Sequence, residues 1–361
     1  MKRTVRVVDA GRTLSVPEGE TVLSAALAAG IPYPHSCQAG RCGACKSRLL
    51  QGEVELLPHS RFALSPEERS EGLVLACRSL PRSDLSITWQ HQLEASPQVG
   101  HRHAGVIAKH AIAPDVLRLA LRSRHGQFRF LPGQYYELGF AGAPMRTYSP
   151  ASQPDSEEIE FHIRVLPGGA ASTALAERLT PGDSVAITGP FGSAYLRETH
   201  PGPLLLLAAS SGLAPIRSIL DRALLVTPSR QIRLYYSVRS RDDGYLWGYL
   251  DHLAERHANL YVEPVVTRDQ AGRPLGRRLP EVLRHVFAHG DLRGWEVHAA
   301  GPEPFVEAMR VAAIELAAND VYADAFVTSP QVAAPGQLPS PRHWVDPAAT
   351  AAGASAAGSA D

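Results

Sequence analysis

Three of the four cysteines of the chain lie within nine residues of one another, and the fourth follows much later. Cys37, Cys42 and Cys45 have the spacing C-x4-C-x2-C, and Cys77 completes the set. Proteins hold a [2Fe–2S] cluster with this spacing, because four thiolates complete the coordination of two tetrahedral irons and three of them come from one tight loop. We therefore predict that these four cysteines ligate a [2Fe–2S] cluster.

Two glycines inside the cysteine loop suit the same chemistry. Gly40 and Gly43 would let the backbone approach a cluster closely and turn its N–H groups toward the sulfurs. Zinc is one alternative, but structural zinc sites favour two pairs of closely spaced cysteines, and the second pair is missing here. Free buried cysteines are the other alternative. His35 could suggest a ligand set that includes histidine, but because all four thiols are present we interpret it as a loop residue.

The sequence around the cysteines predicts a small α+β domain over residues 1–92. Val5–Val8 and Thr13–Val16 are typical of a β-hairpin, and Thr21–Ala29 is typical of a short helix stopped by Gly30. Residues 93–103 are polar and rich in turn formers, which indicates a linker. The other predicted elements of this domain are a helix that begins at the capping box Ser65-Pro66-Glu67-Glu68 and strands at Leu73–Cys77 and Leu85–Trp89.

The pattern changes twice after the linker. From residue 104 to 201, short strands separated by turn signals predict an antiparallel β-barrel. From 202 to 330, apolar strands alternate with helical stretches, which predicts a doubly wound parallel sheet. Residues 331–361 are rich in Ala, Pro, Gly and Ser, and we expect disorder there. The predicted strands are Val106–Ile112, Val116–Leu121, Tyr135–Leu138, Glu158–Val165, Ser184–Gly189, Leu204–Ala208, Ile232–Ser237, Leu260–Val266 and Val297–Ala300, with helices at Ile216–Leu225 and Phe305–Ala318.

Composition argues against several classes of function. The chain has 36 basic and 36 acidic residues, and a formal net charge of zero argues against a broad nucleic-acid-binding surface. No apolar run approaches the roughly 18 residues that a membrane span needs. The N-terminus runs directly into an alternating pattern with no signal-peptide core. We expect a cytoplasmic protein that binds neither nucleic acid nor membrane.

Three further motifs follow one another along the predicted barrel. They are Phe130-Leu-Pro-Gly-Gln-Tyr135, Arg146-Thr-Tyr148-Ser149 and Gly169-Ala170-Ala-Ser172. Their order resembles the flavin-binding motifs of the ferredoxin–NADP⁺ reductase superfamily. With the N-terminal cysteine domain included, the whole chain resembles the single-component reductases of bacterial ring-hydroxylating dioxygenases and of methane and phenol monooxygenases. The alternative for R-x-Y-S is a turn and a barrel strand without a ligand, because the isolated motif occurs by chance.

The resemblance implies FAD and a role for each motif residue. Arg146 would neutralise the flavin pyrophosphate with its planar guanidinium. Tyr148 would stack on the isoalloxazine and Ser149 would hydrogen-bond near its reacting N5 edge, so these two are the candidate catalytic residues. The backbone of Gly169-Ala170-Ala-Ser172, at the start of a predicted helix, would donate to the second phosphate. The fold implied is a β-grasp-like ferredoxin, a flavin-binding barrel and a nucleotide domain.

The nicotinamide motifs depart from the family pattern. The segment Ala208-Ala-Ser-Ser211-Gly212-Leu-Ala-Pro215 resembles the loop G-G-T-G-x-A-P, with Ala209 and Ser210 in place of two glycines. Ala300-Gly301-Pro302 resembles C-G-P, with alanine in place of the cysteine that lies beside the nicotinamide ring. These matches imply that Ser211, Gly212 and Gly301 bind NADH or NADPH.

Two other segments of the nucleotide domain have more than one interpretation. Asp324-Ala-Phe326 resembles the terminal aromatic segment that covers the other face of the flavin, although Phe326 could equally be a core residue of the last strand. The charge run Arg239–Asp243 follows the second predicted strand, where the ribose 2′ position is recognised. Its arginines could hold a 2′-phosphate and its aspartates would repel one; a solvated loop is the third interpretation. The aspartates lead us to expect a preference for NADH.

The resemblance implies an electron-transfer reductase. NAD(P)H would deliver a hydride to FAD, and electrons would pass singly to the [2Fe–2S] cluster and on to a terminal oxygenase or an intermediate electron-acceptor protein. The same domains in the same order also serve non-oxygenase partners such as deoxysugar dehydrases, and the sequence leaves this alternative open. The peripheral subunit of a membrane sodium pump is disfavoured, because that family begins with an anchoring helix and this chain begins with a predicted strand.

Overall fold

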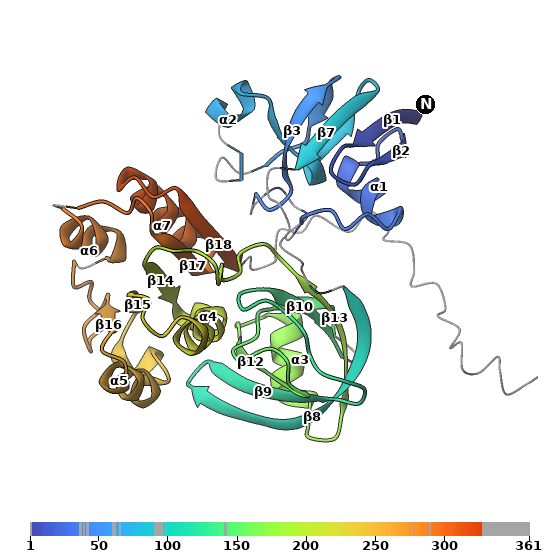
Figure 1. Cartoon of the computed structure of the whole chain (residues 1–361). Helices are drawn as coiled ribbons and strands as arrows, with labels where there is room; N and C mark the ends of the chain where they lie inside the picture. Colours follow the sequence, from blue (N-terminus) through green and yellow to red (C-terminus); the bar gives the residue numbers. More distant parts are fainter. Residues whose placement is uncertain are drawn as a thin grey trace, which may run out of the picture. The chain divides into compact units, whose positions relative to one another are not determined.

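The computed structural model describes residues 2–35, 38, 40, 43–59, 63–64, 66–89, 97, 99–140, 143–276, 278–288 and 290–326 of the chain. These residues form three large sheets, with five, six and five strands, and one short two-stranded sheet (Figure 1). In the part of the chain that the structure describes, no helix has the length and apolar character needed to cross a membrane.

The first large sheet belongs to the N-terminal domain and is mixed, with the strand order β2-β1-β7-β3-β5. β1 (Lys2–Val7) and β2 (Arg12–Pro17) form the predicted hairpin, and β1 pairs in parallel with β7 (Leu85–Trp89). α1 (Val22–Ala28) begins after Thr21, whose Oγ1 accepts a hydrogen bond from the N–H of Ser24 at 3.2 Å. The remaining elements are β3 (Lys46–Gln51), β4 (Val54–Leu56), α2 (Pro66–Ser70), β5 (Leu73–Leu75), the 3₁₀ turn η1 (Ala76–Arg78) and β6 (Ser79–Pro81).

The second sheet is antiparallel throughout, with the order β11-β10-β13-β8-β9-β12, and it forms the barrel-like layer that the strand spacing predicts (Figure 1). Lys109 fixes the helix of this domain, because its Nζ donates to the carbonyl oxygens of Leu175 and Ala176 in the last turn of α3 at 3.2 and 2.6 Å. The elements are β8 (Gly100–Ala113), β9 (Val116–Ser123), β10 (Tyr135–Gly139), β11 (Arg146–Tyr148), β12 (Glu158–Arg164), α3 (Ala170–Arg178) and β13 (Ser184–Phe191).

The third sheet is parallel, with the order β16-β15-β14-β17-β18. Its central strand β14 (Leu204–Ala209) is apolar at every position, because both faces of the sheet are covered. Leu204 and Leu206 belong to the core with α4 and α5, whereas Leu205 and Leu207 belong to the core with α6 and α7. The other elements are the 3₁₀ turn η2 (Ser210–Gly212), α4 (Leu213–Val226), β15 (Ile232–Val238), the 3₁₀ turn η3 (Arg241–Asp243), α5 (Trp247–Arg256), β16 (Leu260–Val266), α6 (Leu279–Val286), β17 (Glu296–Pro302), α7 (Glu303–Glu315) and β18 (Asp320–Phe326).

The predicted fold class is confirmed, and several local predictions need correction. Cys77 lies in η1 and not in a strand. Residues 100–103, predicted as linker, begin β8 and pair with β13 across the barrel. Strand β11, which carries Arg146 and Tyr148, has no counterpart among the predicted strands, because three residues are too few for a visible alternation. Helix α2 begins at Pro66 as predicted, while Ser65 of its capping box and the tail at 331–361 lie outside the described residues.

Candidate functional site

The two cysteines that the structure describes are buried neighbours. Cys45 immediately precedes β3 and Cys77 lies in η1, with exposed fractions of 3% and 5%. The backbone N–H of Cys77 donates to Sγ of Cys45 at 3.5 Å. An N–H aimed at a sulfur stabilises the thiolate form, which is the form that binds iron. Cys37 and Cys42, the other two predicted ligands, lie outside the described residues.

The two glycines of the cysteine loop lie at backbone positions where a side chain would be strained. Gly40 and Gly43 have φ values of +71° and +75°, a region that favours glycine. A Cβ atom on Gly40 would lie 2.7 Å from Cγ of Arg78, and one on Gly43 would lie 3.2 Å from the carbonyl oxygen of Ala63. These two positions therefore favour glycine, and the described thiols suit the ligand chemistry of a [2Fe–2S] cluster.

The first barrel motif holds the strand that carries the second. Gln134 is buried, its Oε1 accepts from the N–H of Leu131 at 2.8 Å, and its Nε2 donates to the carbonyl oxygen of Gly192 at 3.2 Å. These bonds fix the start of β10, and β10 pairs with β11 along the sheet edge. The first motif is thus structural, and it places the arginine and tyrosine of the second motif.

Arg146 and Tyr148 are both on β11, and they differ in exposure. Arg146 is exposed, and within the described part of the chain its guanidinium donates only to the carbonyl oxygen of Met145, at 2.8 Å. Its remaining N–H groups suit a phosphate. Tyr148 is half-buried against the barrel core, and burial raises the pKa of its phenol to about 12. The ring is therefore neutral at physiological pH, which suits stacking on a flavin.

The predicted phosphate segment begins a helix as expected. Gly169 is the N-cap residue of α3, and no side chain caps the helix there. The first backbone N–H groups of α3 are thus open to an anion. Ser172 is buried, and its Oγ accepts from the N–H of Leu166 at 3.1 Å, which closes the loop before the helix. Ala170 is the first residue of the helix and carries one of the open N–H groups.

The two nucleotide loops touch at glycines that no other residue could replace. Ser211 and Gly212 are buried in η2, between β14 and α4. A Cβ atom on Gly212 would lie 2.1 Å from the carbonyl oxygen of Ala300. Gly301 has φ +147°, and a Cβ there would lie 3.0 Å from the carbonyl oxygen of Ala209. The turn η2, which leads directly into α4, begins without a side-chain cap, so its first N–H groups can receive a dinucleotide phosphate.

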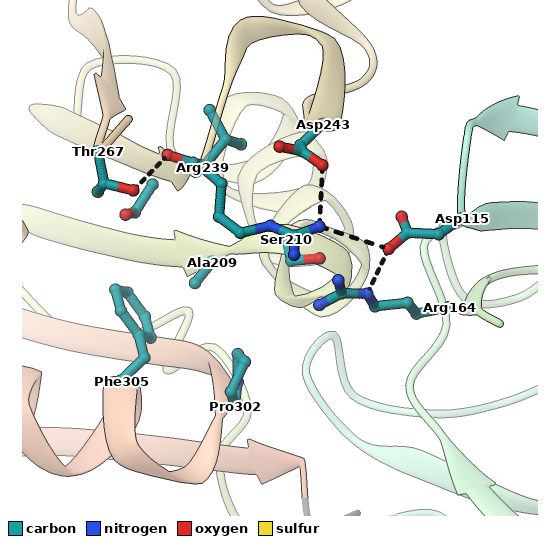
Figure 2. A pocket seen from close by; sticks show the side chains of 11 residues that line it. Asp115, Arg164, Ala209, Ser210, Arg239, Asp243, Thr267, Pro302 and Phe305 are labelled. Atoms are coloured by element: carbon teal, nitrogen blue, oxygen red, sulfur yellow. Dashed lines mark hydrogen bonds and ion pairs between the residues drawn. The ribbon is translucent and has the colours of Figure 1, made fainter. Parts of the chain in front are cut away.

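A cavity of about 260 Å³ opens at the carboxyl edge of the parallel sheet, next to the loop at Ser210 (Figure 2). Asp115 from the barrel lines one side of it, and its Oδ2 is 2.7 Å from Nε of Arg164 and 3.9 Å from Nη2 of Arg239. Arg239 also donates to Oδ1 of Asp243 at 2.9 Å. The charges of two arginines and two carboxylates therefore cancel beside the end of β15. This is the second strand of the domain, and in dinucleotide-binding folds the ribose is recognised at its end.

Ser149 contacts a carboxylate from the opposite end of the chain. Its Oγ donates to Oδ2 of Asp324 on β18 at 2.7 Å, across a separation of 175 residues. Burial raises the pKa of Asp324 to about 6, and the hydrogen bond from Ser149 opposes that rise. The pair can therefore hold or release a proton near neutral pH. Ala300 lies beside Asp324 in the sheet, and Phe326 ends β18 partly buried.

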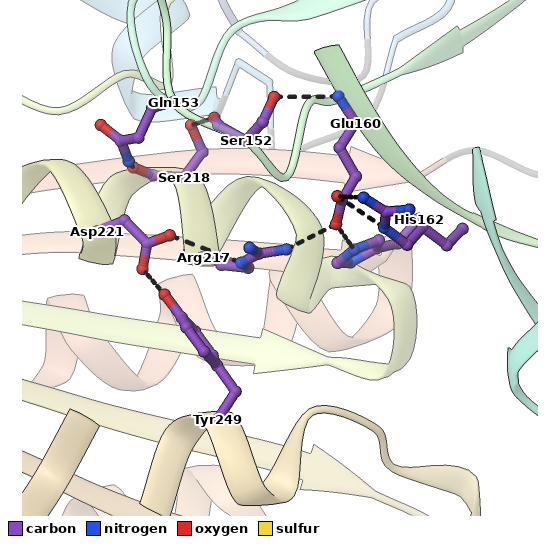
Figure 3. A network of polar contacts seen from close by, with 9 residues as sticks. Ser152, Gln153, Glu160, His162, Arg217, Ser218, Asp221 and Tyr249 are labelled. Atoms are coloured by element: carbon purple, nitrogen blue, oxygen red, sulfur yellow. Dashed lines mark hydrogen bonds and ion pairs between the residues drawn. The ribbon is translucent and has the colours of Figure 1, made fainter. Parts of the chain in front are cut away.

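A polar network fixes α4 against the barrel (Figure 3). Glu160 of β12 accepts from Nε of Arg118 at 2.7 Å, from Nη1 of Arg217 on α4 at 2.7 Å, and from Nε2 of His162 at 2.8 Å. Burial alone would raise the pKa of Glu160, but these hydrogen bonds and the charge of Arg217 lower it. Ser218 adds a bond from its Oγ to the carbonyl oxygen of Ser152 at 2.7 Å. These bonds hold α4 at a fixed position against the barrel.

Comparison with known proteins gives each domain a family. Residues 5–82 match a model described as a 2Fe-2S iron-sulfur cluster binding domain. Residues 103–195 match an oxidoreductase FAD-binding domain, and residues 206–311 match an oxidoreductase NAD-binding domain. The three matches have the order and the cofactors that the motifs predict.

Whole-chain relatives agree with the domain matches. The chain is 34% identical over 324 residues to the reductase component of the naphthalene 1,2-dioxygenase/salicylate 5-hydroxylase systems of Ralstonia sp, which covers 88% of this chain and 96% of the relative. It is 36% identical over 329 residues to the reductase component of the alkene monooxygenase system of Xanthobacter autotrophicus, with 88% and 98% covered. The crystal structure of an Amycolatopsis cytochrome P450 reductase is similar, with a TM-score of 0.70, 33% identity, and 90% and 98% covered.

The chain belongs to the reductase components of oxygenase systems. It is a flavin- and nicotinamide-dependent oxidoreductase with a [2Fe–2S] domain, an FAD domain and an NAD domain. The structure also adds residues that the motifs did not single out. Asp115 and Arg164 come from the barrel and have no motif around them, whereas Asp324 already belonged to the terminal segment named from the sequence.

Proposed function

We propose that this reductase passes electrons from NADH, through FAD and the [2Fe–2S] cluster, to a partner oxygenase. The observation that carries the proposal is the contact between Ser149 and Asp324, because it places a proton-accepting pair beside the glycine loops at Gly212 and Gly301. The names of the relatives support an oxygenase as the acceptor, in preference to a dehydrase. NADH is an intracellular reductant, so we also propose a cytoplasmic location.

Each site residue has a distinct task in this proposal. Arg146 and the N-terminus of α3 bind the two phosphates of FAD, and Tyr148 stacks on its ring system. The N-terminus of α4, with Ser211 and Gly212, binds the phosphates of the nicotinamide nucleotide. When bound at these residues, FAD would supply the link between a two-electron hydride donor and a one-electron acceptor.

The remaining site residues accept a proton, pack against the flavin or ligate the iron. Ser149 and Asp324 take up the proton that remains once both electrons have left, and Phe326 covers the second face of the flavin. Cys37, Cys42, Cys45 and Cys77 hold the cluster. We further propose domain boundaries at residues 92 and 202, with the barrel beginning at Gly100, because β8 starts there.

The preference for NADH rests on the cavity in Figure 2. Arg239 is the arginine placed to bind a 2′-phosphate, but it is already paired with Asp243 at 2.9 Å and lies 3.9 Å from Asp115. Asp243 is fixed in turn, since its Oδ2 accepts from the N–H and Oγ of Ser240 at 2.9 and 2.7 Å. A 2′-phosphate would therefore have to displace carboxylates from Arg239 and would meet their charge. A ribose 2′-hydroxyl meets no such cost.

Binding of adenosine fragments tests this preference without turnover. We expect the protein to bind AMP more tightly than 2′-phospho-AMP, and kcat/KM to favour NADH over NADPH. Asp115→Asn should raise the affinity for 2′-phospho-AMP by roughly 5- to 30-fold, since a charge-assisted contact contributes about 1–2 kcal/mol. Asp242→Asn is the matched control, because Asp242 is exposed and does not line the cavity. A wild type that favours 2′-phospho-AMP would contradict the proposal.

The electron path itself is tested by anaerobic stopped-flow spectroscopy of the fully loaded protein. NADH should bleach the flavin first, and the absorbance of the cluster should fall afterwards. The reduced protein should then be re-oxidised by the oxygenase component that co-purifies with it from its native host. Reduction of the cluster without prior reduction of the flavin would refute the proposed order.

A further inference from the structure

A second, much smaller cavity lies directly beside Asp324, inside the parallel sheet domain. Its volume is about 10 Å³, and its lining includes His298 and Ala300 from β17, Tyr322 and Asp324 from β18, and apolar side chains of α4. A space of roughly 10–15 Å³ holds one water molecule where polar partners are present. Asp324 and His298 are the polar partners here.

The register of the two strands explains why this space exists. β17 and β18 are parallel neighbours, with His298 opposite Tyr322 and Ala300 opposite Asp324. Side chains two residues apart on a strand point to the same face, so all four side chains share one face of the sheet. Alanine at position 300 fills little of the space between the imidazole and the carboxylate. Within the described chain these two groups make no direct hydrogen bond, and one bridging water fits the diagonal spacing between them.

The surroundings of His298 determine which of its ring nitrogens can accept a hydrogen bond. Nε2 of His298 lies 2.7 Å from Oε1 of Glu296. Burial alone would raise the pKa of Glu296, but His298, the N–H of Arg197 and the guanidinium of Arg230 lower it to about 2. The carboxylate is therefore ionised and accepts from Nε2–H. Burial lowers the pKa of His298, so the ring is neutral and its Nδ1 is left as an acceptor.

The other charged groups around the ring keep it neutral. Arg230 pairs with Glu296 at 2.7 Å, and Arg197 lies over the ring of Tyr322 at 4.3 Å from its centroid. Both guanidiniums lower the pKa of His298, whereas Glu296 raises it. Tyr322 stacks on His298 with a centroid distance of 5.1 Å and contributes a neutral ring. From α4, the cavity lining contains only Pro215, Ile216 and Ile219, none of which titrates.

We propose that the cavity holds one water, donating to Nδ1 of His298 and hydrogen-bonded to Asp324, and that His298 positions this water as the path by which Asp324 exchanges its proton. The proposal rests on the proposed function, which places Ser149 and Asp324 at the hydride site. Oxidation of one NADH to NAD⁺ releases two electrons and one proton. The electrons leave singly to the iron, and the proton passes through the Ser149 hydroxyl to Asp324. Asp324 then releases the proton through this water to the solvent, so that the proton leaves the site as the two electrons leave to the iron.

Two substitutions of His298 separate this role from simple packing. His298→Asn keeps an acceptor at the position of Nδ1 but loses the bond to Glu296. His298→Gln keeps a donor at the position of Nε2, and thus the bond to Glu296, but removes the acceptor for the water. If His298 positions the water, His298→Gln should slow proton exchange more than His298→Asn does. If His298 serves only as a hydrogen-bond donor to Glu296, His298→Asn should have the larger effect.

The first readout is the re-oxidation of NADH-reduced, fully loaded protein by ferricyanide, measured in H₂O and in D₂O. We expect His298→Gln to slow proton-coupled re-oxidation by about tenfold or more and to enlarge its solvent isotope effect. His298→Asn should stay near wild type. Equal effects in both variants, a larger effect in His298→Asn, or no effect in either would overturn the proposal. Reduction of the wild-type flavin by NADH, recorded in the same experiment, tests the proposed function separately.

The second readout does not depend on turnover. Infrared difference spectra of the loaded protein should show the carboxylic acid band of Asp324, identified by its loss in Asp324→Asn. After transfer to D₂O, the band should shift quickly in wild type and His298→Asn, and at least several-fold more slowly in His298→Gln. A band that exchanges at the same rate in all three proteins would show that no water held by His298 serves Asp324.

Discussion

The predicted iron site and the proposed hydride site of this protein are built in opposite ways. Three of the four predicted cluster ligands come from nine consecutive residues, and two glycines with positive φ shape the same loop. The hydride site joins Ser149 of the barrel to Asp324 of the last strand, 175 residues later. A local site of this kind is readable as a motif, whereas a site assembled from two domains depends on how their sheets pack. The cluster should therefore respond to single substitutions within its loop, and the hydride site to contacts between domains.

Cys77→Ser gives the largest expected effect and tests whether the two sites are independent. The variant should lose its cluster, because a serine hydroxyl is a poor ligand for these irons. NADH should still reduce the flavin, since the FAD and NAD domains have their own cores. Iron and sulfide analysis, with stopped-flow reduction of the flavin, measures both. The control is Ser79→Ala, which removes a buried bond to Leu75 without removing a ligand. A full iron content in Cys77→Ser, or zinc in wild type, would exclude the assigned cluster.

Arg146→Ala should weaken FAD binding by roughly 10- to 100-fold, because a hydrogen bond to a charged group contributes about 1.5–3 kcal/mol. Within the described chain the guanidinium pairs with no carboxylate. The substitution should therefore lower the affinity for FAD without breaking an ion pair of the protein. Flavin fluorescence during titration of the flavin-free protein with FAD gives the dissociation constant. Arg122→Ala is the control, since Arg122 is also an exposed barrel arginine but pairs with Glu158. A preference for FMN over FAD would show that the phosphate segments are wrongly assigned.

Asp324→Asn should change stability in a pH-dependent way. The pKa of Asp324 is about 6 in the folded protein against 3.8 for the ordinary side chain, because burial disfavours the charge. The folded state thus binds the proton more tightly, and its stability falls as pH rises from about 4 to 6. Asparagine removes that loss, so above pH 6 the variant should be more stable by about 1–2 kcal/mol, and near pH 4 it should match wild type. Urea unfolding at both pH values measures this, and an equal shift at both would exclude a raised pKa.

The sequence predicts what depends on local spacing. Hairpin β1–β2, helix α3 after Gly169 and every strand of the parallel sheet except β18 follow from periodicity, glycine positions and motif order. Strand β11 was not predicted, because a segment of three residues is too short to show the alternation of polar and apolar residues. Residues 100–103 look like a linker because His101 and its neighbours are polar, yet they pair with β13, where Nδ1 of His101 lies 2.8 Å from Oγ1 of Thr188.

Contacts between domains could not be predicted from the sequence, because no local pattern of residues encodes them. Arg239 and Asp243 were expected to compete over a 2′-phosphate, but they bond to each other, and Asp115 from a barrel turn joins them. Asp115 has no motif around it, and its position depends on the packing that Glu160 and Arg217 help to fix. The acidity of Asp324 likewise depends on burial against α4 and β17, which requires the complete fold.

The smallest expected effect concerns the loop in which the sequence departs from the family pattern. Ser210 takes the place of a glycine and has φ +51°, the left-handed region that costs a residue with a Cβ about 1–2 kcal/mol. Ser210→Gly removes this cost but adds roughly 0.5–1 kcal/mol of backbone entropy to the unfolded chain. The net result should be a gain of about 0.5–1 kcal/mol in the free energy of unfolding, measured by urea denaturation without nucleotide.

Ser211→Gly is the matched control for this loop, because Ser211 is the next residue and is not among those with positive φ. It should destabilise the protein by roughly 0.5–1 kcal/mol, since glycine there adds entropy and relieves no strain. If both variants lose stability to the same extent, the left-handed turn at Ser210 carries no strain. If only Ser210→Gly raises the free energy of unfolding, the serine at this position lowers the stability of the protein. The reason for keeping it would then lie in what its side chain does beside the nucleotide cavity that it lines.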